Sequence, residues 1–265
     1  MACVIREAGI RFPMSGGILM TGFAKGRYIA RHAEGPEDVE AAQRLRYMAF
    51  HGSPEAGRDQ DDFDDICTHI LVEEVSNGHL VCCFRILPLS GGGEISRSYS
   101  AQFYELSALA AFEGPMVEMG RFCVDPEVRD PDVVRVAWGA MTRYVDDHGV
   151  EMLFGCSSFK GTDSDTYHDA FAMLAAKHLA PRRWWPRVKA PAVVEFAKKL
   201  RLRSPDAKQA MLRMPPLLRT YLLMGGWVSD HAVVDRQMNT LHVFTGLEVA
   251  AIPPARKRLL RAVAQ

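Results

Sequence analysis

A strand–helix–strand pattern in the middle of the chain places the strongest constraint on how it folds. Asp130 or Asp132 caps an amphipathic helix expected over 132–148, Pro131 fits its first turn, and Gly149 ends it. An apolar, strand-like run stands on each side of this helix, VEMGRFCV before it and EMLFGCSSF after it. Two strands joined by one helix normally lie parallel in the same sheet. The pattern therefore predicts a parallel strand pair with the helix packed against it.

Periodic patterns elsewhere predict further strands and helices around this unit. Alternating residues indicate a strand at 26–33, and helical spacing after an early Pro36 indicates a helix at 34–50. Two apolar runs separated by Asn77-Gly78 predict a hairpin. The remaining expected elements are a short helix near 104–109, a helix near 169–179, and strand-like pieces at 232–234 and 241–244. The sequence thus predicts an α/β (α+β) fold with a central mixed sheet flanked by helices.

The length and composition suit one large globular domain. The chain has 265 residues, of which 48% are hydrophobic and 24% charged, so it can bury a sizeable core. We expect an N-terminal leader at 1–25, a domain at 26–250 and a basic tail at 251–265 that forms a short helix. An elaborated, basic, tryptophan-containing insertion is expected within the domain at about 181–213.

Several classes of function are disfavoured by composition and spacing. The formal net charge is zero, so overall charge implies no nucleic-acid partner. The nine histidines lack the spacing of metal ligands, so no metal is implied. The six cysteines form no C-x-x-C motif, and the chain shows no signal peptide and no apolar run long enough to cross a membrane. These features favour a cytoplasmic protein with reduced cysteines, and peripheral contact with the inner face of the cytoplasmic membrane stays open as an alternative.

Isolated charges within apolar segments mark the candidate site. Glu118 and Arg121 stand in the middle of a strand that would otherwise be apolar, and a buried charge is costly unless it is paired or catalytic. Other residues of this kind are Arg46 and Phe50 on the first helix, Asp61 and Asp64 in an acidic loop, and Arg85 on a hairpin strand.

The order of these residues resembles that of a known enzyme class. RYMAF, DDFD, the arginine of FRILP and EMGRFCV resemble the R-x-x-x-F, D-x-x-D, R and E-x-x-R motifs of acyl-homoserine-lactone synthases. The longer strings FDDICTHILV, LFGCSSFKGTD and PPLLRTYLLMGGWV resemble more specifically the bacterial ornithine-lipid N-acyltransferases. This second resemblance covers roughly residues 28 to 250.

The resemblance implies an acetyltransferase-like (GNAT) fold and an N-acyltransferase activity. Members of that family move a (3R)-3-hydroxyacyl group from acyl carrier protein to the α-amine of L-ornithine, which gives lyso-ornithine lipid. The implied donor carries 4'-phosphopantetheine, and no bound cofactor is implied. Two departures stand out: HGSPE follows Phe50 where homoserine-lactone synthases carry a tryptophan, and PEVRDP lacks the glycines of the GNAT pyrophosphate loop. The second departure agrees with a carrier-protein donor rather than coenzyme A.

Glu118 is the candidate general base, acting on the incoming amine directly or through a water. The competing interpretation is a buried structural pair with Arg121 or Arg85. Those two arginines either bind the carboxylate of the amino acid or keep Glu118 ionised.

The other candidates are assigned to substrate binding. Asp61 and Asp64 either neutralise a side-chain ammonium or hold the acidic loop against Arg46, which shares a helix face with Phe50.

Ser157 and Ser158 are expected near the acyl chain or the leaving sulfur, although strand-end serines often bond only to backbone. We expect oxyanion-binding N–H groups at a bulge near Cys123 and Val124. A nucleophilic role for Cys123 is a weaker alternative, because only Arg121 stands near enough in sequence to lower the pKa of its thiol.

The basic insertion is expected to dock an acidic acyl carrier protein or an anionic membrane surface, and the plain alternative is a solvated charged face. The residues are Arg182, Arg183, Trp184, Trp185, Arg187, Lys189, Lys198 and Lys199. Alternatives for the whole chain are acylation of another amino acid such as glutamine, homoserine-lactone synthesis, and a non-catalytic membrane-surface protein.

Overall fold

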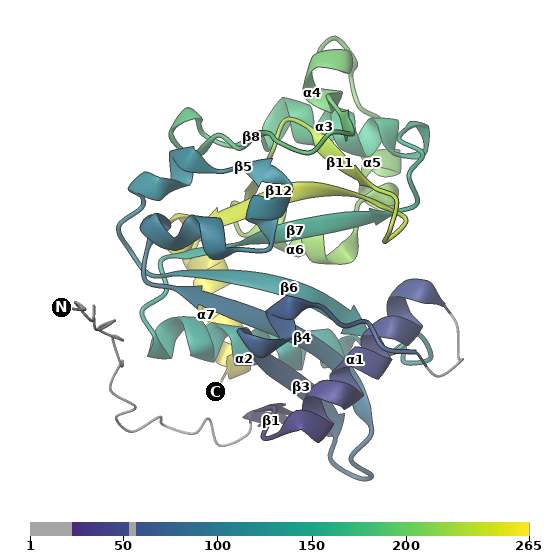
Figure 1. Ribbon diagram of the computed structural model, residues 1–265, viewed down its shortest axis with the longest axis vertical. Coiled ribbons are helices and arrows are strands. Elements are labelled where there is room, and N and C mark those ends of the chain that lie inside the picture. Colours follow the sequence, from purple (N-terminus) through teal and green to yellow (C-terminus); the bar gives the residue numbers. More distant parts are fainter. Residues whose placement is uncertain (1–22, 53–56, 265) are drawn as a thin grey trace, which may run out of the picture.

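One long mixed sheet dominates the computed structural model, which describes residues 23–52 and 57–264 (Figure 1). Its strands follow the order β1-β2-β3-β4-β6-β7-β12-β11-β9, and β10 pairs with β12. The strands are β1 (Phe23–Lys25), β2 (Tyr28–His32), β3 (Thr68–Glu74), β4 (Leu80–Leu89), β6 (Met116–Val124), β7 (Met152–Lys160), β9 (Val193–Val194), β10 (Trp227–Val228), β11 (Ala232–Asp235) and β12 (Thr240–Glu248). β5 (Tyr104–Glu105) and β8 (Arg187–Val188) form a separate pair. The predicted central mixed sheet is confirmed.

Seven α-helices occur in the described part of the chain, together with short 3₁₀ turns. The helices are α1 (Pro36–His51), α2 (Pro131–Asp147), α3 (His168–Lys177), α4 (Phe196–Lys199), α5 (Ala207–Arg213), α6 (Pro216–Leu223) and α7 (Pro254–Ala264). The turns used below are η1 (Asp62–Asp65), η2 (Gly92–Arg97), η3 (Ser100–Gln102), η4 (Ser107–Ala111) and η5 (Asp165–Tyr167). No described helix has both the length and the apolar character needed to cross a membrane.

The central strand–helix–strand unit forms as predicted. The Asp130 side chain accepts the Asp132 N–H at 2.9 Å and so caps α2. β6 and β7 on either side of this helix are parallel, whereas the other neighbouring pairs of the sheet are antiparallel. The hairpin of β3 and β4 also forms, with Gly78 at φ 72° in its turn.

Two sequence expectations need correction or lie outside the described residues. The short helix expected near 104–109 is instead the strand β5 followed by η4, because Tyr104 of β5 pairs with Val188 of β8. Residues 1–22 of the expected leader lie outside the described residues, and the strand β1 already begins at Phe23.

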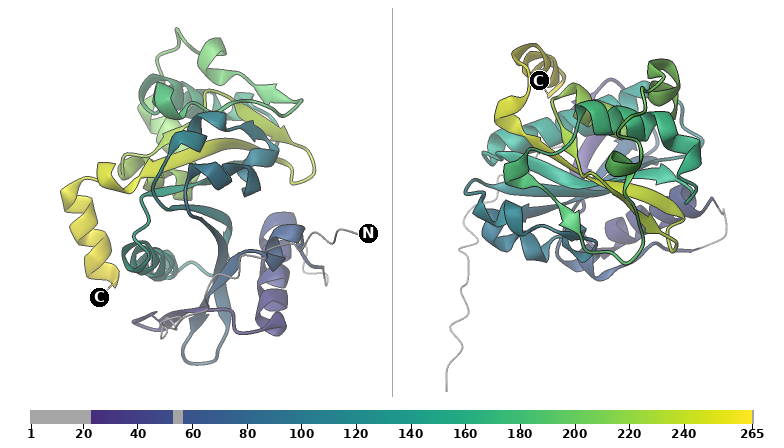
Figure 2. Two further views of the ribbon diagram at one scale, coloured as in Figure 1. Left: turned by 60° about the vertical axis from the view of Figure 1, so that its left-hand side comes forward. Right: turned by 90° about the horizontal axis from the view of Figure 1, so that it is seen from above.

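The first half of the sheet, β1 to β4 and β6, lies between two helices (Figure 2, left). On one face α2 packs through Val133, Val136 and Ala140. On the other face α1 packs through Ala42 and Leu45. The basic tail is the helix α7, which packs beside α2 with Arg261 donating to Asp146 at 2.9 Å. Both faces are thus covered, as a buried parallel pair requires.

The second half of the sheet, β7 with β12 and β11, has different covers. The turns η2, η3 and η4 pack on one face through residues that include Ile95 and Leu109. The helices α3 to α6 pack on the other face through Phe171, Phe196 and Leu218. The boundary between the two halves falls at β6 and β7, in the middle of the molecule (Figure 1).

Candidate active site

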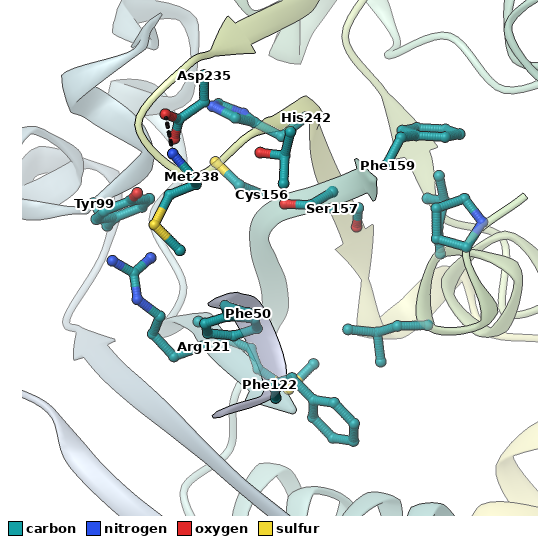
Figure 3. Close-up of a pocket in the computed structure, with 18 of the residues that line it drawn as sticks. Phe50, Tyr99, Arg121, Phe122, Cys156, Ser157, Phe159, Asp235, Met238 and His242 are labelled. Atoms are coloured by element: carbon teal, nitrogen blue, oxygen red, sulfur yellow. Dashed lines mark hydrogen bonds between the residues drawn. The ribbon is translucent and has the colours of Figure 1, made fainter. Parts of the chain in front are cut away.

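A cavity opens where β6 and β7 separate. The two strands pair only over Met116–Glu118 and Met152–Phe154, although each continues for six further residues. The space between their ends has a volume of about 520 Å³ and is also lined by residues of α1, α6 and β12 (Figure 3). A pocket of this size, open between two central strands, suits a small-molecule or acyl substrate.

Gly155 lies where the strands begin to separate. A side chain there would overlap the carbonyl oxygen of Met119 on β6, so only glycine lets the two backbones approach this closely. The separation of the strands is therefore tied to one residue of the GCSSF string.

We expect Gly155→Ala to destabilise the protein by about 1–3 kcal/mol, because the new methyl group must push β7 away from β6. Urea unfolding followed by circular dichroism measures the change. Gly120→Ala is the matched control, since its methyl group would meet the nearest atoms of Arg85 at 3.8 Å, an ordinary contact. Equal loss of stability in both variants would contradict a special close approach at Gly155.

A β-bulge in β6 directs Arg121 toward the site. Arg85 pairs with Gly120 and Cys83 with Cys123, so Arg121 and Phe122 together face one residue of β4. Arg121 has φ 52°, a left-handed conformation that non-glycine residues adopt at a cost of about 1–3 kcal/mol. Because of the bulge, its guanidinium bonds to the same acidic loop as Arg85 instead of turning to the α2 face.

Three arginines and three aspartates form a paired cluster beneath the cavity. Arg46 donates to Asp59 at 2.8 Å and to Asp64 at 2.7 Å. The full set of members is Arg46, Asp59, Asp61, Asp64, Arg85 and Arg121. The formal charges of these six cancel, which is the condition under which buried charges are tolerated.

The cluster keeps its carboxylates ionised. Burial alone would raise the pKa of Asp64, but hydrogen bonds and charges from Arg46 and Arg85 hold it well below its usual range. The pKa of Asp61 is likewise lowered, against its burial, by Arg85 and Arg121. Arg46 is 1% exposed, so the cluster fastens the loop that carries these aspartates to α1, β4 and β6.

Glu118 is buried and yet lines the cavity. It is 4% exposed, and its Oε1 accepts the Ser100 N–H at 2.7 Å and the Ser100 hydroxyl at 2.6 Å. Its Oε2 accepts the Tyr99 N–H at 2.7 Å. A carboxylate oxygen accepts about two hydrogen bonds, so within the described structure Oε2 retains one free acceptor position.

Burial raises the pKa of Glu118 above its ordinary value, although the bonds from Ser100 and Tyr99 and the charge of Arg85 oppose this. A carboxylate with a raised pKa is a stronger base than an exposed one. Glu118 is thus held in place by donors from η3 and the preceding residue while keeping the capacity to accept a proton.

The cavity has a polar end and an apolar end (Figure 3). Tyr99, Arg121 and Asp235 lie at the polar end, where the Arg121 guanidinium carbon is 5.0 Å from the centre of the Tyr99 ring. Phe122 and Phe159 lie toward the apolar end, and Leu217 and Leu218 of α6 add to its wall. Such a cavity can hold an ionic group and an alkyl chain at once.

The structure brings together most of the residues expected at the site. Glu118, Arg121 and Arg85 line the cavity with Phe50, and Ser157 and Ser158 lie on the β7 wall. The remaining predicted residues Arg46, Asp61 and Asp64 lie beneath the wall and do not line it. The sequence left two roles open for the aspartates, binding a side-chain ammonium or holding the acidic loop in place. The ion pairs of these residues agree with the second role.

The expectation for Cys123 is not met. Its side chain packs between the sheet and α1, with its sulfur 3.5 Å from that of Cys83, and it does not line the cavity. Contact with Cys83 and burial raise the pKa of the Cys123 thiol well above its ordinary value, which disfavours a nucleophile. The bulge lies at Arg121 and Phe122, two residues before the expected place.

Sequence reasoning missed five residues of the site. They are Asp59, Tyr99, Ser100, Asp235 and His242. Asp59 stands in the acidic run and was detectable there. The others come from segments without a charge pattern, so only the tertiary structure identifies them. Burial lowers the pKa of His242 to about 4, so it is a neutral wall residue near pH 7.

The basic residues of the insertion are exposed, whereas its tryptophans are partly buried. Trp184 packs edge-to-face on Phe112 at 5.4 Å and, like Trp185, contributes to the core beneath η4. Arg183 donates to Glu248 at 2.8 Å. The exposed positions are Arg182, Arg183, Arg187, Lys189, Lys198 and Lys199. The basic side chains are therefore exposed, although Arg183, Arg187 and Lys198 already pair with glutamates of the chain. The tryptophan rings are largely occupied by packing.

Comparisons with known proteins agree with this architecture. The acetyltransferase (GNAT) domain family matches residues 45–139. The chain is 32% identical over 239 residues to the L-ornithine N(alpha)-acyltransferase of Rhodobacter capsulatus, covering 85% of this chain and 91% of the relative. It is 31% identical to that of Rhizobium meliloti, covering 84% of this chain and 80% of the relative.

A shorter match reaches the other family suggested by the motifs. The acyl-homoserine-lactone synthase of Agrobacterium fabrum is 36% identical over 93 residues, covering 33% of this chain and 43% of that protein. The first two matches extend over most of both chains and confirm the more specific resemblance. The chain belongs to the L-ornithine N(alpha)-acyltransferase family and is an acyltransferase of the GNAT fold.

Proposed function

We propose that this acyltransferase moves a (3R)-3-hydroxyacyl group from acyl carrier protein to the α-amine of L-ornithine and so forms lyso-ornithine lipid. The observation that carries the proposal is a buried carboxylate, Glu118, on a cavity that has one ionic end and one alkyl end. The product has the same two parts, an amino-acid head and a fatty chain. The names of the relatives supply the acceptor.

The free acceptor position on Glu118 Oε2 takes a proton from the α-ammonium of the acceptor, directly or through a water. The free amine then attacks the thioester carbonyl, a C–N bond forms, and the C–S bond breaks when the tetrahedral intermediate collapses. Glu118 releases this first proton to solvent, and the second proton that the attacking nitrogen must lose passes through Glu118 to the departing thiolate. The ammonium thus loses two protons, one to solvent and one to the thiol, and the amide leaves neutral with Glu118 again a carboxylate.

Two other features of the site assist this step. Arg121 uses Nε for Asp59 and Nη2 for Asp61, so within the described contacts its Nη1 is available to bind the carboxylate of the amino acid. Backbone N–H groups at the bulge of Arg121 and Phe122 stabilise the oxyanion, since a bulge frees them from the β4 ladder.

The donor is acyl carrier protein rather than coenzyme A. In GNAT enzymes the pyrophosphate of coenzyme A binds at a glycine-rich turn before a helix N-terminus. The corresponding end of α2 follows PEVRDP, and the Asp132 N–H there already donates to the carboxylate of Asp130 at 2.9 Å. An anion there would meet a like charge, whereas a phosphopantetheine arm needs no such site. Exposed basic residues of the insertion offer a complementary surface to an acidic carrier protein.

We expect kcat/KM with the 3-hydroxyacyl carrier protein to exceed that with the matching coenzyme A thioester by about 100-fold or more, because the end of α2 does not suit the pyrophosphate of coenzyme A. Each tenfold in this ratio corresponds to about 1.4 kcal/mol of contacts with the donor. Steady-state kinetics with both donors and a constant ornithine concentration measure the ratio. Equal values for the two donors would contradict the assignment of the donor and leave the acyl transfer itself standing.

The proposed function as a whole is tested by mass spectrometry of a reaction containing purified protein, 3-hydroxyacyl carrier protein and ornithine. The expected product is the Nα-acyl amino acid, with none formed by Glu118→Gln. The proposal is wrong if no N-acyl amino acid forms with ornithine or with other amino acids while the donor remains intact.

A further inference from the structure

Asp235 ends β11 and lies at the polar end of the cavity (Figure 3). It pairs with Thr240 of β12, which in turn pairs with Lys160 of β7, so the three side chains share one face of the sheet. That face also carries His242, whose side chain lines the same cavity. The position of Asp235 is thus set by the regular hairpin of β11 and β12.

Two acidic residues line the cavity among those that the structure describes, Glu118 and Asp235. Glu118 is bound by three donors and is assigned to the α-amine. The aspartates of the acidic loop cannot serve a second amine, because Asp61 and Asp64 already bind arginines on both oxygens. Asp235 is therefore the remaining carboxylate that faces the substrate.

The carboxylate of Asp235 can accept further hydrogen bonds. Its Oδ1 accepts the Met238 N–H at 3.0 Å, and across residues 23–52 and 57–264 no lysine, arginine or histidine nitrogen forms an ion pair with it. Lys160 lines the same cavity but belongs to no ion pair with Asp235 in the described contacts. A half-buried carboxylate without a cation beside a substrate cavity is a site for a cationic group.

The charges of Glu118 and Asp235 both act on Cys156, which lines the cavity. Burial raises the pKa of the Cys156 thiol to about 12, and the charges of Glu118 and Asp235 add to this effect. The Ser100 hydroxyl that binds Glu118 is 3.4 Å from the Cys156 sulfur, so Cys156 lies next to the group that holds Glu118. A molecule near Cys156 is therefore within reach of the negative charges of Glu118 and Asp235 as well as the positive charge of Arg121.

Resting on the proposed function, we infer that Asp235 binds the side-chain ammonium of the acceptor and selects a diamino acid over a neutral amino acid. Glu118 then receives the α-amine, Arg121 the carboxylate and Asp235 the second amine. Three polar groups of the acceptor thus meet three complementary groups of the protein.

The test compares ornithine with 2-aminopentanoate, which has the same carbon chain but no side-chain ammonium. Asp235→Asn removes the charge and keeps an oxygen that can accept the Met238 N–H, so the turn is preserved. We expect its kcat/KM for ornithine to fall about 10- to 100-fold and that for 2-aminopentanoate to change less than about threefold, since the lost bond is to a charged group.

Two variants serve as controls. Asp165→Asn removes an exposed carboxylate on η5, outside the cavity, and is expected to leave both substrates unchanged. Asp235→Glu keeps the charge and is expected to retain the preference for ornithine. Thermal melting of each variant verifies folding.

The outcomes separate the inference from the proposed function. A selective loss on ornithine in Asp235→Asn supports the inference. An equal loss on both substrates, or an unchanged preference for ornithine, overturns it while acyl transfer to ornithine by the parent protein stands. A parent protein that acylates neutral amino acids but not ornithine overturns the proposed acceptor and the inference together.

Discussion

Glu118→Gln is expected to lower kcat by about 10²–10⁴-fold, the usual contribution of a general base. The amide has nearly the same shape as the carboxylate but cannot take the proton of the incoming ammonium. Its NH₂ group would also face an N–H donor of Tyr99 or Ser100, so we expect a loss of roughly 1–3 kcal/mol in stability. Single-turnover acylation with purified protein measures the chemical step.

The control for this variant is Glu113→Gln, which changes an exposed glutamate shortly before β6 and away from the cavity. It is expected to keep the parent rate and melting temperature. If Glu118→Gln remains folded and retains more than about a tenth of the parent kcat, Glu118 is a structural residue and the base must be sought elsewhere.

The pH dependence of kcat/KM reports the same group. Because burial raises the pKa of Glu118, activity should fall with decreasing pH through a midpoint above the ordinary value of 4.5. The Ser100 hydroxyl stabilises the charged form, so its removal in Ser100→Ala should move this midpoint to higher pH. A structural role for Glu118 would leave the midpoint where it is.

The parts of the fold that could be predicted from sequence are those with local signals. The helix α2 has a capping Asp130, a proline in its first turn and a terminating Gly149, each of which acts within a few residues. The hairpin of β3 and β4 turns at Asn77-Gly78 for the same reason. Local chemistry decided these elements, so the sequence was sufficient.

The charged residues of the site were also predictable, but their partners were not. A carboxylate and two guanidiniums within apolar strands indicate a site because isolated buried charges are costly. Nothing local shows that Arg46 and Arg121 share Asp59, or that Tyr99 and Ser100 donate to Glu118. Those contacts join segments far apart in the chain.

The error at Cys123 has a single physical cause. The bulge was expected near Cys123 and Val124 but lies at Arg121 and Phe122, and its one extra residue reverses the face on which every later side chain lies. Cys123 accordingly lies against α1, and Arg121 takes the place at the cavity. A bulge has no dependable sequence signal when its left-handed residue is an arginine instead of a glycine.

Arg46→Met is expected to destabilise the protein by about 3–5 kcal/mol, the usual cost of removing one partner from a buried ion pair. Methionine fills a similar volume, but the cluster would keep three aspartates with two arginines and so carry an unbalanced negative charge. Asp64 would lose two hydrogen bonds, and Asp59 would lose two. Urea unfolding at neutral pH measures the difference.

The matched control is Arg44→Met on the same helix, where an exposed Arg44 pairs with Glu40 and contributes at most about 0.5 kcal/mol. The effect of Arg46→Met should also depend on pH. The folded-state pKa of Asp64 lies below the ordinary value of 3.8, so its contribution is complete above that value and is lost as the pH falls further. The stability difference between parent and variant should therefore shrink in acid. A difference that is small at neutral pH, or that grows as the pH is lowered, would show that the cluster does not hold the acidic loop in place.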